Sequence, residues 1–556
     1  MKNFPAGREH FFAGHLQIRL DAAQIGFLEW PPVVPSLPME TVLPILAMLA
    51  LVACSGVALR FAPRLPLPLL QIAVGALLAW ADPRLVVHID PQAFLLLFLP
   101  PMLFADGWQM PKREFGLHIG PILALSVGLV LATVGVVGYA LHAMLPAMPL
   151  PVAFLLAAVL SPTDALAVSA IARSHALPPR LRHVLEGESL MNDASALVAV
   201  KFTVAATLTH HFSAGEAVLE VLRIGGIGLA TGALFSWVFC RLHDRLLYWR
   251  ADQPVVPTVL LLLLMPFAPY LIAEELGGSG VLAAVAAGMT ASLFDVKSSR
   301  FNACHVQTQA TWNVVGFAFN GLVFMLLGQQ LPGLLAQLPV PADGGAVTAW
   351  RALQLGAGAF AITALLLALR FGWLAAQARG LAWLARLRGR TPAARHTVSP
   401  ALLGVGALGG IRGGVTLAAV LGVPATLADG SPFPARDLLV FLAIAVIVLS
   451  LLAASIGMPW LLRRLPNLPQ DDRHAREQVR ARRRAARAAS REIDSSPLPL
   501  MLLSGAGPDV QTHLRALQAE REELHRLLRR RQINDETLRH LVRELDLAEM
   551  ALRGAG

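Results

Sequence analysis

Cysteine is scarce in this chain, which carries only three cysteines in 556 residues. Cys54, Cys240 and Cys304 lie far apart and show no paired spacing. Pairs of cysteines at short, regular spacing are the signature of disulfide frameworks and of thiolate metal sites. The sequence therefore predicts neither of these, and we interpret the three cysteines as packing residues.

Charged residues are also few, because they make up 15% of the chain, whereas hydrophobic residues make up 55%. The mean hydropathy is +0.59. A soluble globular protein carries about 25% charged residues. This composition excludes an ordinary soluble enzyme and predicts an all-α polytopic membrane protein.

Two kinds of motif are missing as well. The sequence contains no Walker A pattern, which argues against an ATP-driven pump. Its histidines show no HExxH or comparable ligand spacing. We therefore expect no cofactor and no resident metal ion.

Long apolar runs occupy most of the chain instead. A membrane-spanning helix needs roughly 20 apolar residues, and this length divides the sequence into thirteen candidate helices. They cover residues 41–59, 66–81, 91–107, 119–142, 150–172, 184–208, 217–240, 254–273, 278–295, 311–331, 352–375, 400–424 and 436–462. The sequence thus predicts about thirteen transmembrane helices.

Lysine and arginine collect in every second loop between these helices. One set of loops carries, for example, Lys112, Arg113 and Arg182, whereas residues 143–150 and 209–216 contain neither lysine nor arginine. Because positively charged loops stay on the cytoplasmic side, the N-terminus is predicted outside and the C-terminus in the cytoplasm, in the cell (inner) membrane. The net charge of +10 follows in large part from this topology, so we expect a lipid bilayer and no nucleic acid as partner.

The two ends of the chain differ from its apolar body. Residues 1–38 hold several charges and a Pro-rich stretch, but no apolar core of signal-peptide length. Beyond residue 465 the chain becomes strongly charged, and leucines recur at helical intervals from 510 to 552. We expect a poorly ordered N-terminal extension over 1–38, a transmembrane domain over 39–465 and a charged cytoplasmic helical tail over 466–556.

The segment Ser161 to Val168, SPTDALAV, places polar side chains inside an apolar run. Pro162 lacks a backbone donor and disfavours helical geometry in the residue before it. We therefore expect the helix to break beside Thr163 and Asp164, and broken helices at mid-membrane expose carbonyls that coordinate ions in many transporters. In the alternative interpretation, Pro162 only kinks the helix and Asp164 caps its end.

A second polar cluster lies in the run from Glu186 to Lys201. Ser189, Asn192 and Asp193 are three and four residues apart, so on a helix they face one way, while Glu188 points about 100° away from Ser189. Charge at membrane depth is costly and is normally kept for function. Because hard cations prefer oxygen ligands, we predict that Asp193 binds either a monovalent cation or a proton; alternatively, it belongs to a structural hydrogen-bond network.

Three further charges lie in apolar or glycine-rich segments, namely Asp106, Arg370 and Arg412. A buried guanidinium needs a carboxylate or the negative ends of broken helices, although Arg370 could instead reach the cytoplasmic interface. Asp106 follows the tandem prolines at 100 and 101. Two interpretations of Asp106 stay open, since it either lines the cytoplasmic entrance or only marks the helix end.

Three motifs, SPTDA at 161–165, GESLMND at 187–193 and GGIRGG at 409–414, occur together in this order. Over residues 40–465 the chain resembles the monovalent cation/proton antiporters of the first cation-proton-antiporter class, the bacterial sodium/proton exchangers related to eukaryotic sodium/hydrogen exchangers. The resemblance implies a homodimer, built partly from inverted repeats, with two broken helices that cross at mid-membrane.

The resemblance also implies a role for each site residue. Asp193 is the shared cation and proton site, Thr163, Asp164 and Ser189 take part in cation binding, Glu188 and Arg370 form a structural ion pair, and Arg412 balances the charge at the crossing. Electrogenic relatives carry two adjacent aspartates, whereas this chain has asparagine at position 192. In this it resembles the electroneutral branch of the family. Many members have a glutamate soon after the tandem prolines, where this chain has Ala105 and Asp106, so ion binding by Asp106 does not follow from the resemblance.

These observations predict a secondary active antiporter, not an enzyme, that exchanges sodium for protons and serves pH homeostasis. The nearest alternative is potassium/proton antiport. The alternative from another class is a cation channel or sensor derived from the same fold. A channel does not need an alternating protonation site, so the single Asp193 beside a broken helix favours exchange.

Overall fold

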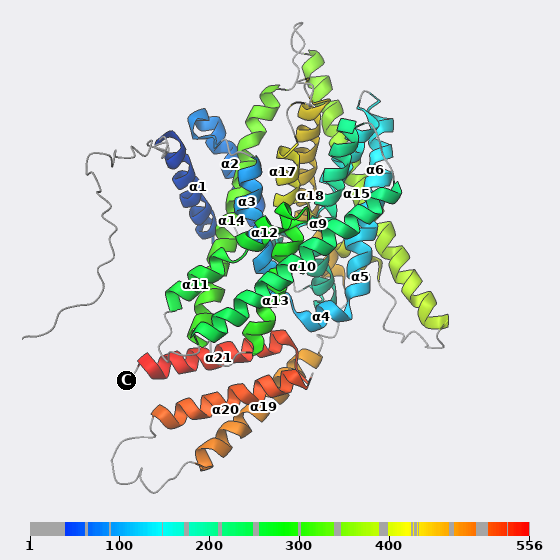
Figure 1. Cartoon of the computed structure of the whole chain (residues 1–556). Helices are drawn as coiled ribbons and strands as arrows, with labels where there is room; N and C mark the ends of the chain where they lie inside the picture. Colours follow the sequence, from blue (N-terminus) through cyan, green and yellow to red (C-terminus); the bar gives the residue numbers. More distant parts are fainter. Residues whose placement is uncertain are drawn as a thin grey trace, which may run out of the picture.

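The structure is a computed structural model of the chain (Figure 1). It describes residues 39–61, 65–87, 91–146, 148–171, 177–209, 214–247, 255–297, 302–337, 346–387, 399–423, 426, 431, 433–465, 472–495, 510–530 and 532–554. Every regular element in these ranges is a helix, which agrees with the fold class predicted from composition. The N-terminal extension over 1–38 lies outside the described residues.

The helices that precede residue 465 form the apolar body. Its first half comprises α1 (Met39–Ala58), α2 (Leu67–Ala81), the short turn η1 (Pro83–Leu85), α3 (Pro91–Gln109), α4 (Lys112–Leu117), α5 (Ile119–Leu123), the π-helical turn η2 (Ala124–Leu129), α6 (Val130–Met144), α7 (Leu150–Val159), α8 (Ala165–Ile171) and α9 (Pro179–Thr209). Its second half comprises α10 (Ala214–Leu247), α11 (Val255–Leu264), α12 (Phe267–Glu275), α13 (Gly280–Lys297), α14 (Asn302–Gln337), α15 (Ala346–Leu387), α16 (Pro400–Leu408), α17 (Gly414–Leu421) and α18 (Arg436–Arg464).

Each of the thirteen predicted segments overlaps at least one helix of the body. Among the described residues, six helical segments are long and apolar enough by themselves to cross a membrane. They are Ile119–Met144, Leu222–His243, Val256–Glu275, Gln307–Gly333, Leu353–Trp383 and Arg436–Arg464. The total of thirteen crossings stays a prediction.

One interruption was not predicted from the sequence. The segment expected as a single helix over 254–273 divides into α11 and α12 at Met265 and Pro266. Proline has no backbone donor, and its ring clashes with the preceding turn of a helix. Pro266 therefore ends α11, and α12 begins directly after it.

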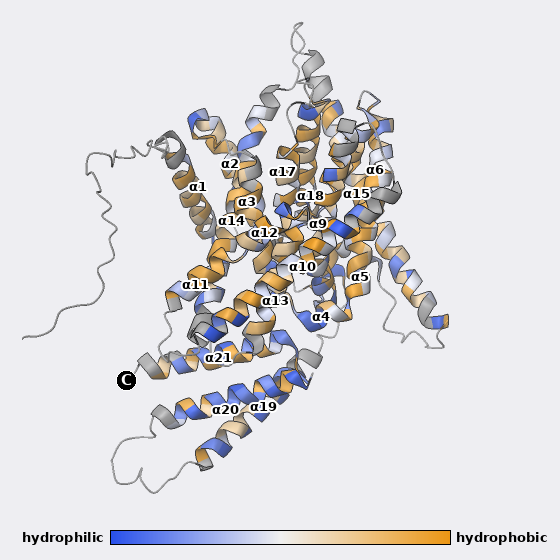
Figure 2. Ribbon diagram, viewed as in Figure 1, coloured by the Kyte–Doolittle hydropathy of each residue, from blue (hydrophilic) through white to orange (hydrophobic). Residues whose placement is uncertain are grey.

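The outer face of the body is apolar. Large hydrophobic side chains such as Trp80, Leu131, Phe360 and Ile456 are exposed there. Figure 2 shows hydrophobic colours along the body helices and mostly hydrophilic colours along the C-terminal helices. Soluble proteins rarely expose large apolar areas of this kind, so the body is that of a multi-pass membrane protein.

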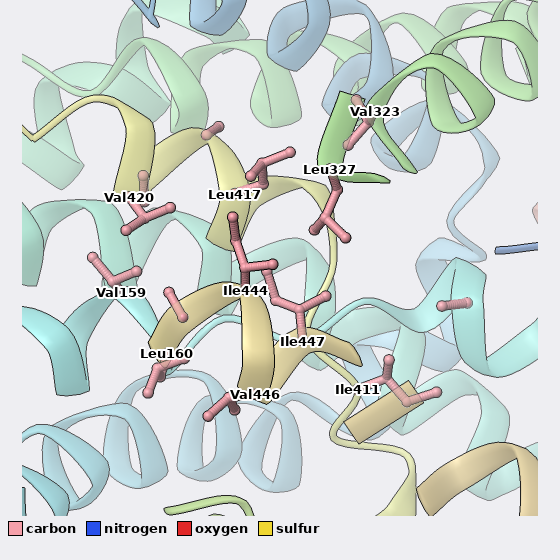
Figure 3. Packing of buried hydrophobic residues seen from close by; sticks show 14 of the residues in the cluster. Val159, Leu160, Val323, Leu327, Ile411, Leu417, Val420, Ile444, Val446 and Ile447 are labelled. Atoms are coloured by element: carbon pink, nitrogen blue, oxygen red, sulfur yellow. The ribbon is translucent and has the colours of Figure 1, made fainter. Parts of the chain in front are cut away.

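The buried core gathers around α18. Leu160, Ile411 and Leu417, which belong to two separate interrupted helices, pack against Ile444 and Ile447 of α18 (Figure 3). All five side chains are buried. Because protein interiors are close-packed and transmit displacement, this contact holds both interruptions in a fixed relation.

Three polar helices follow the body, namely α19 (Asp472–Ser495), α20 (Val510–Arg529) and α21 (Asp535–Gly554). They share a small core that includes Ala481, Ala485, Leu524, Leu527 and Leu538. Figure 1 shows α21 between the body and the other two helices. The leucine spacing seen from 510 to 552 corresponds to α20 and α21.

Candidate functional site

Two interrupted helices meet at the centre of the body. The first is α7 and α8, separated by the non-helical residues 160–164, and the second is α16 and α17, separated by residues 409–413. The two interruptions are hydrogen-bonded to each other, because the backbone amide of Asp164 donates to the carbonyl of Ile411 at 2.7 Å. Both helices that were expected to break do so, at Pro162 and within GGIRGG.

Arg412 lies inside this crossing with its guanidinium buried. Its Nε donates to the Leu160 carbonyl at 2.8 Å, and its Nη1 donates to the Gly410 carbonyl. The Leu160 carbonyl lies at the C-terminal end of α7, and the Gly410 carbonyl lies just after α16. Helix dipoles leave partial negative charge at these ends. The guanidinium therefore compensates the negative ends of both broken helices.

Gly413 allows the two interruptions to approach closely. A Cβ atom at this position would lie 2.3 Å from Oδ2 and 2.6 Å from Cβ of Asp164. Real Cβ atoms essentially never come within 3.0 Å of such atoms. The carboxylate of Asp164 thus occupies space that any other residue at 413 would fill.

Glu188 and Arg370 form a buried ion pair between α9 and α15. The two guanidinium nitrogens Nη1 and Nη2 each contact one carboxylate oxygen, and the second contact measures 2.6 Å. Arg370 Nε donates to the Gly406 carbonyl of α16 at 2.9 Å. The side chains are 1% and 2% exposed, so Arg370 does not reach the interface, and the pair joins three helices.

A hydrogen-bond chain connects α9 to the first interruption. Asn192 Nδ2 donates to Thr163 Oγ1 at 2.7 Å, and the hydroxyl of Ser189 donates to the Thr163 carbonyl at 2.8 Å. The Thr163 hydroxyl in turn points to Glu188 Oε1 at 3.4 Å. The polar residues around 188–193 therefore hold residues 161–164 in their non-helical conformation.

A cavity of about 300 Å³ opens beside this network. Its lining includes the carboxylates of Asp106, Asp164 and Asp193, together with Thr163 and Ser189. The side chain of Asp193 is buried, at 6% exposure. Within the described residues, no hydrogen bond or ion pair holds the Asp193 carboxylate, so it is available to a cation or a proton entering the cavity.

The structure brings the predicted site residues together in two groups, one that lines the cavity and one that supports it. Asp106, Asp164, Asp193, Ser189 and Thr163 line the cavity. Asn192, Glu188, Arg370 and Arg412 support it from outside, through the contacts given above. Within the described residues, no group of three or more histidine, cysteine or acidic side chains is placed to hold a resident metal ion.

Sequence reasoning did not place four further charged residues at the cavity. Arg182, Glu186, Glu536 and Arg539 also line it. Arg182 and Glu186 stand four residues apart on α9 with their charged atoms 3.6 Å apart, and this spacing was readable in the sequence. Glu536 and Arg539 come from the tail, and no sequence signal connects them to residues more than 300 positions earlier.

Comparison with known proteins gives consistent results. Residues 46–464 match the family described as sodium/hydrogen exchanger, transmembrane. The chain is 39% identical over 551 residues to the uncharacterized Na+/H+ exchanger YjcE of Escherichia coli, covering 92% of this chain and 99% of that protein. It is 39% identical over 427 residues to the sodium, potassium, lithium and rubidium/H+ antiporter of Bacillus subtilis, covering 76% of this chain and 61% of that protein.

A solved structure has the same fold. The sodium proton antiporter MjNhaP1 from Methanocaldococcus jannaschii superimposes with a TM-score of 0.55 at 17% identity, covering 77% of this chain and 99% of that chain. At this identity the likeness shows the fold alone. Together with the sequence matches over most of its length, it leads to one conclusion: this chain belongs to the sodium/hydrogen exchanger family.

Proposed function

We propose that this protein is an electroneutral antiporter that exchanges sodium for protons across the cell membrane, with Asp193 as the alternating site. The observation that carries the proposal is the buried carboxylate of Asp193, which has no ion-pair or hydrogen-bond partner among the described residues and lies in a cavity beside two broken helices. One carboxylate that binds either of two cations, but not both, couples their movements in opposite directions.

The surroundings of Asp193 supply ligands for a partly dehydrated sodium ion. Sodium is a hard cation that prefers oxygen, and Thr163, Ser189 and Asp164 contribute hydroxyl, carbonyl and carboxylate oxygens to the same cavity. The Asp106 carboxylate lines this cavity too. We assign Asp106 to the cytoplasmic entrance, where its charge attracts cations.

Asn192 supports electroneutral exchange. Its amide is held by the Thr163 hydroxyl at 2.7 Å, and an amide neither gains nor loses a proton in this pH range. With Asp193 as the only titrating group of the pair, one proton moves for one monovalent cation.

We further propose the arrangement of the chain in the membrane. Residues 39–465 form the exchanger and residues 466–556 a cytoplasmic tail, with the N-terminus outside. The contact of the tail with Lys112 and Arg182 supports this orientation, because both residues lie in the positively charged loops. A homodimer rests on the family resemblance.

Potassium is a second candidate substrate. It is supported by the Bacillus subtilis relative, whose name includes sodium, potassium, lithium and rubidium. The chain covers 61% of that relative, so we keep sodium as the leading cation. A panel of these four cations in one assay separates the two proposals.

The proposal is tested in everted membrane vesicles. A respiration-driven proton gradient should collapse when sodium is added, and Asp193→Asn should abolish the response while the protein still inserts and purifies as the wild type does. Electroneutrality is checked by clamping the membrane potential, which should leave the rate unchanged. Sodium-driven exchange in the Asp193→Asn protein would contradict the site assignment.

A further inference from the structure

The N-terminal turn of α21 is fastened to the cytoplasmic mouth of the cavity at three places. Asp535 Oδ2 accepts a hydrogen bond from the Lys112 backbone amide at 2.9 Å. Glu536 Oε1 accepts one from Arg182 Nη2 at 2.8 Å. Arg539 Nη1 donates to the Trp108 carbonyl, near the C-terminal end of α3, at 3.3 Å. These contacts join α21 to α3, α4 and α9.

The same turn forms part of the cavity wall. Glu536 and Arg539 line the cavity that holds Asp193, and Arg182 and Glu186 lie beside them. The contact between α21 and α9 therefore borders the same cavity as Asp193. The tail contributes to this wall, although it is far from the site in sequence.

We propose that the first turn of α21 is the cytoplasmic gate of the exchanger, with Glu536 as the positioning residue that holds it closed. When this turn is docked on Arg182, it restricts access to Asp193, and its release opens the cavity to cytoplasmic cations. The inference rests on the proposed function of the cavity as the transport site.

Contacts within the tail hold α21 independently of the body. Arg521 of α20 forms buried ion pairs with Asp546 at 2.7 Å and with Glu549 at 3.0 Å on α21. The side chain of Asn534 caps α21 by accepting a hydrogen bond from the Thr537 amide at 2.7 Å. Because these contacts lie within the tail, α21 can leave the mouth without losing its own support.

His183 adds a proton-dependent element to the contact. Its side chain is 2% exposed, and its Nδ1 and Nε2 lie 3.6 Å from Glu186 Oε2 and 3.9 Å from Glu536 Oε2. Neither nitrogen has a hydrogen-bond partner among the described residues. The imidazole thus stands between one carboxylate of α9 and one carboxylate of α21.

The direction of the pH effect follows from the charges around His183. Glu186 lies beside it on α9 and Glu536 on α21. His118 is close enough to interact with it electrostatically, and Arg182 pairs with the same Glu536. A protonated imidazole attracts both carboxylates and tightens the docking of α21. The gate is therefore expected to be held more tightly when the His183 imidazole carries a proton than when it is neutral.

The test uses the full-length protein in proteoliposomes with its cytoplasmic face accessible. Sodium-driven proton flux is measured from about pH 6 to pH 8, the range in which imidazole titrates. Loss of one partly exposed ion pair corresponds to an increase of about two- to fivefold in rate at the acidic end. We expect this increase for Glu536→Gln, together with a displacement of the rate profile to lower pH.

Two further variants make the result specific. His183→Gln should reduce the rise of the rate with pH, because the charge between the two carboxylates no longer changes. Glu544→Gln is the matched control, since Glu544 lies on the same helix but pairs with Arg482 of α19 instead of with the body. The control should keep the wild-type profile.

A second experiment measures the docking of α21 independently of transport. Amide hydrogen exchange in residues 535–539, compared at one pH, should be faster in Glu536→Gln than in the wild type and unchanged in Glu544→Gln. If Glu536→Gln has the wild-type pH profile and the wild-type amide exchange, the gate is refuted. A wild-type protein that docks α21 in this way but transports no sodium would instead refute the proposed function.

Discussion

Glu188 and Asp193 are two buried carboxylates on the same helix, five residues apart, and they have opposite surroundings. Glu188 is held by both terminal nitrogens of Arg370 and is 1% exposed. Asp193 is 6% exposed and, among the described residues, forms no ion pair. The cavity reaches Asp193, whereas Glu188 is not among the residues that line it.

The difference separates a structural carboxylate from the carboxylate that we propose for transport, both on α9. A buried carboxylate with a guanidinium partner depends on that partner, because removing either member leaves an uncompensated charge. A carboxylate without a partner stays free to take up a cation or a proton. The paired carboxylate and the carboxylate proposed to exchange ions thus lie on neighbouring turns of α9.

The largest expected effect comes from removing the fixed partner. Arg370→Gln leaves the Glu188 carboxylate buried without its guanidinium, and breaking such a pair costs about 3–5 kcal/mol. We expect a corresponding loss of stability in denaturation of the purified protein. Arg379→Gln on the same helix is the control, because Arg379 is exposed, and it should change the stability by less than about 0.5 kcal/mol.

The double variant Glu188→Gln/Arg370→Gln sharpens this result. Both charges are then absent, so most of the loss seen in Arg370→Gln should be recovered. A single variant as stable as the wild type would show that the ion pair does not anchor α9 to α15.

A smaller effect is expected at the crossing. Gly413→Ala forces the new methyl group against Asp164, and overpacking of this kind costs typically about 1–3 kcal/mol. Because Asp164 lines the cavity, sodium affinity should fall along with thermal stability. Gly135→Ala is the matched control, since a Cβ there meets no atom within 4 Å; equal stability of the two variants would contradict the close approach.

The smallest effect on stability is expected at the exchangeable carboxylate. Asp193→Asn loses no ion pair or hydrogen bond of the described structure, so its stability should stay within about 1 kcal/mol of the wild type. The measurement is the same denaturation curve used for Arg370→Gln. A loss as large as that of Arg370→Gln would mean that Asp193 is a structural carboxylate after all.

Much of the site could be predicted because its causes are local. Pro162 lacks a backbone donor and disfavours helical geometry in the residue before it, and the glycines of 409–414 permit the second interruption. The three- and four-residue spacing of Ser189, Asn192 and Asp193 places them on one face of any helix. These features depend on backbone geometry that the sequence specifies directly.

Other parts of the site depend on contacts between distant segments. Asp106 had two open interpretations, and the structure places it in the same cavity as Asp164 and Asp193. Arg370 had a snorkelling alternative, which its burial against Glu188 excludes. The surroundings of Asp106 and Arg370 could not be predicted from their neighbours in the sequence. They depend on how α3 and α15 pack against α9.

The sequence by itself determined the membrane class, the two broken helices and the candidate carboxylate, since apolar length, proline, glycine and helical spacing act within a few residues. Only the tertiary structure decided which charges are neutralised and which remain available, because ion pairing requires atoms within a few ångströms. The same holds for the docking of α21 at the cavity mouth, where Glu536 meets Arg182 across 354 positions of chain.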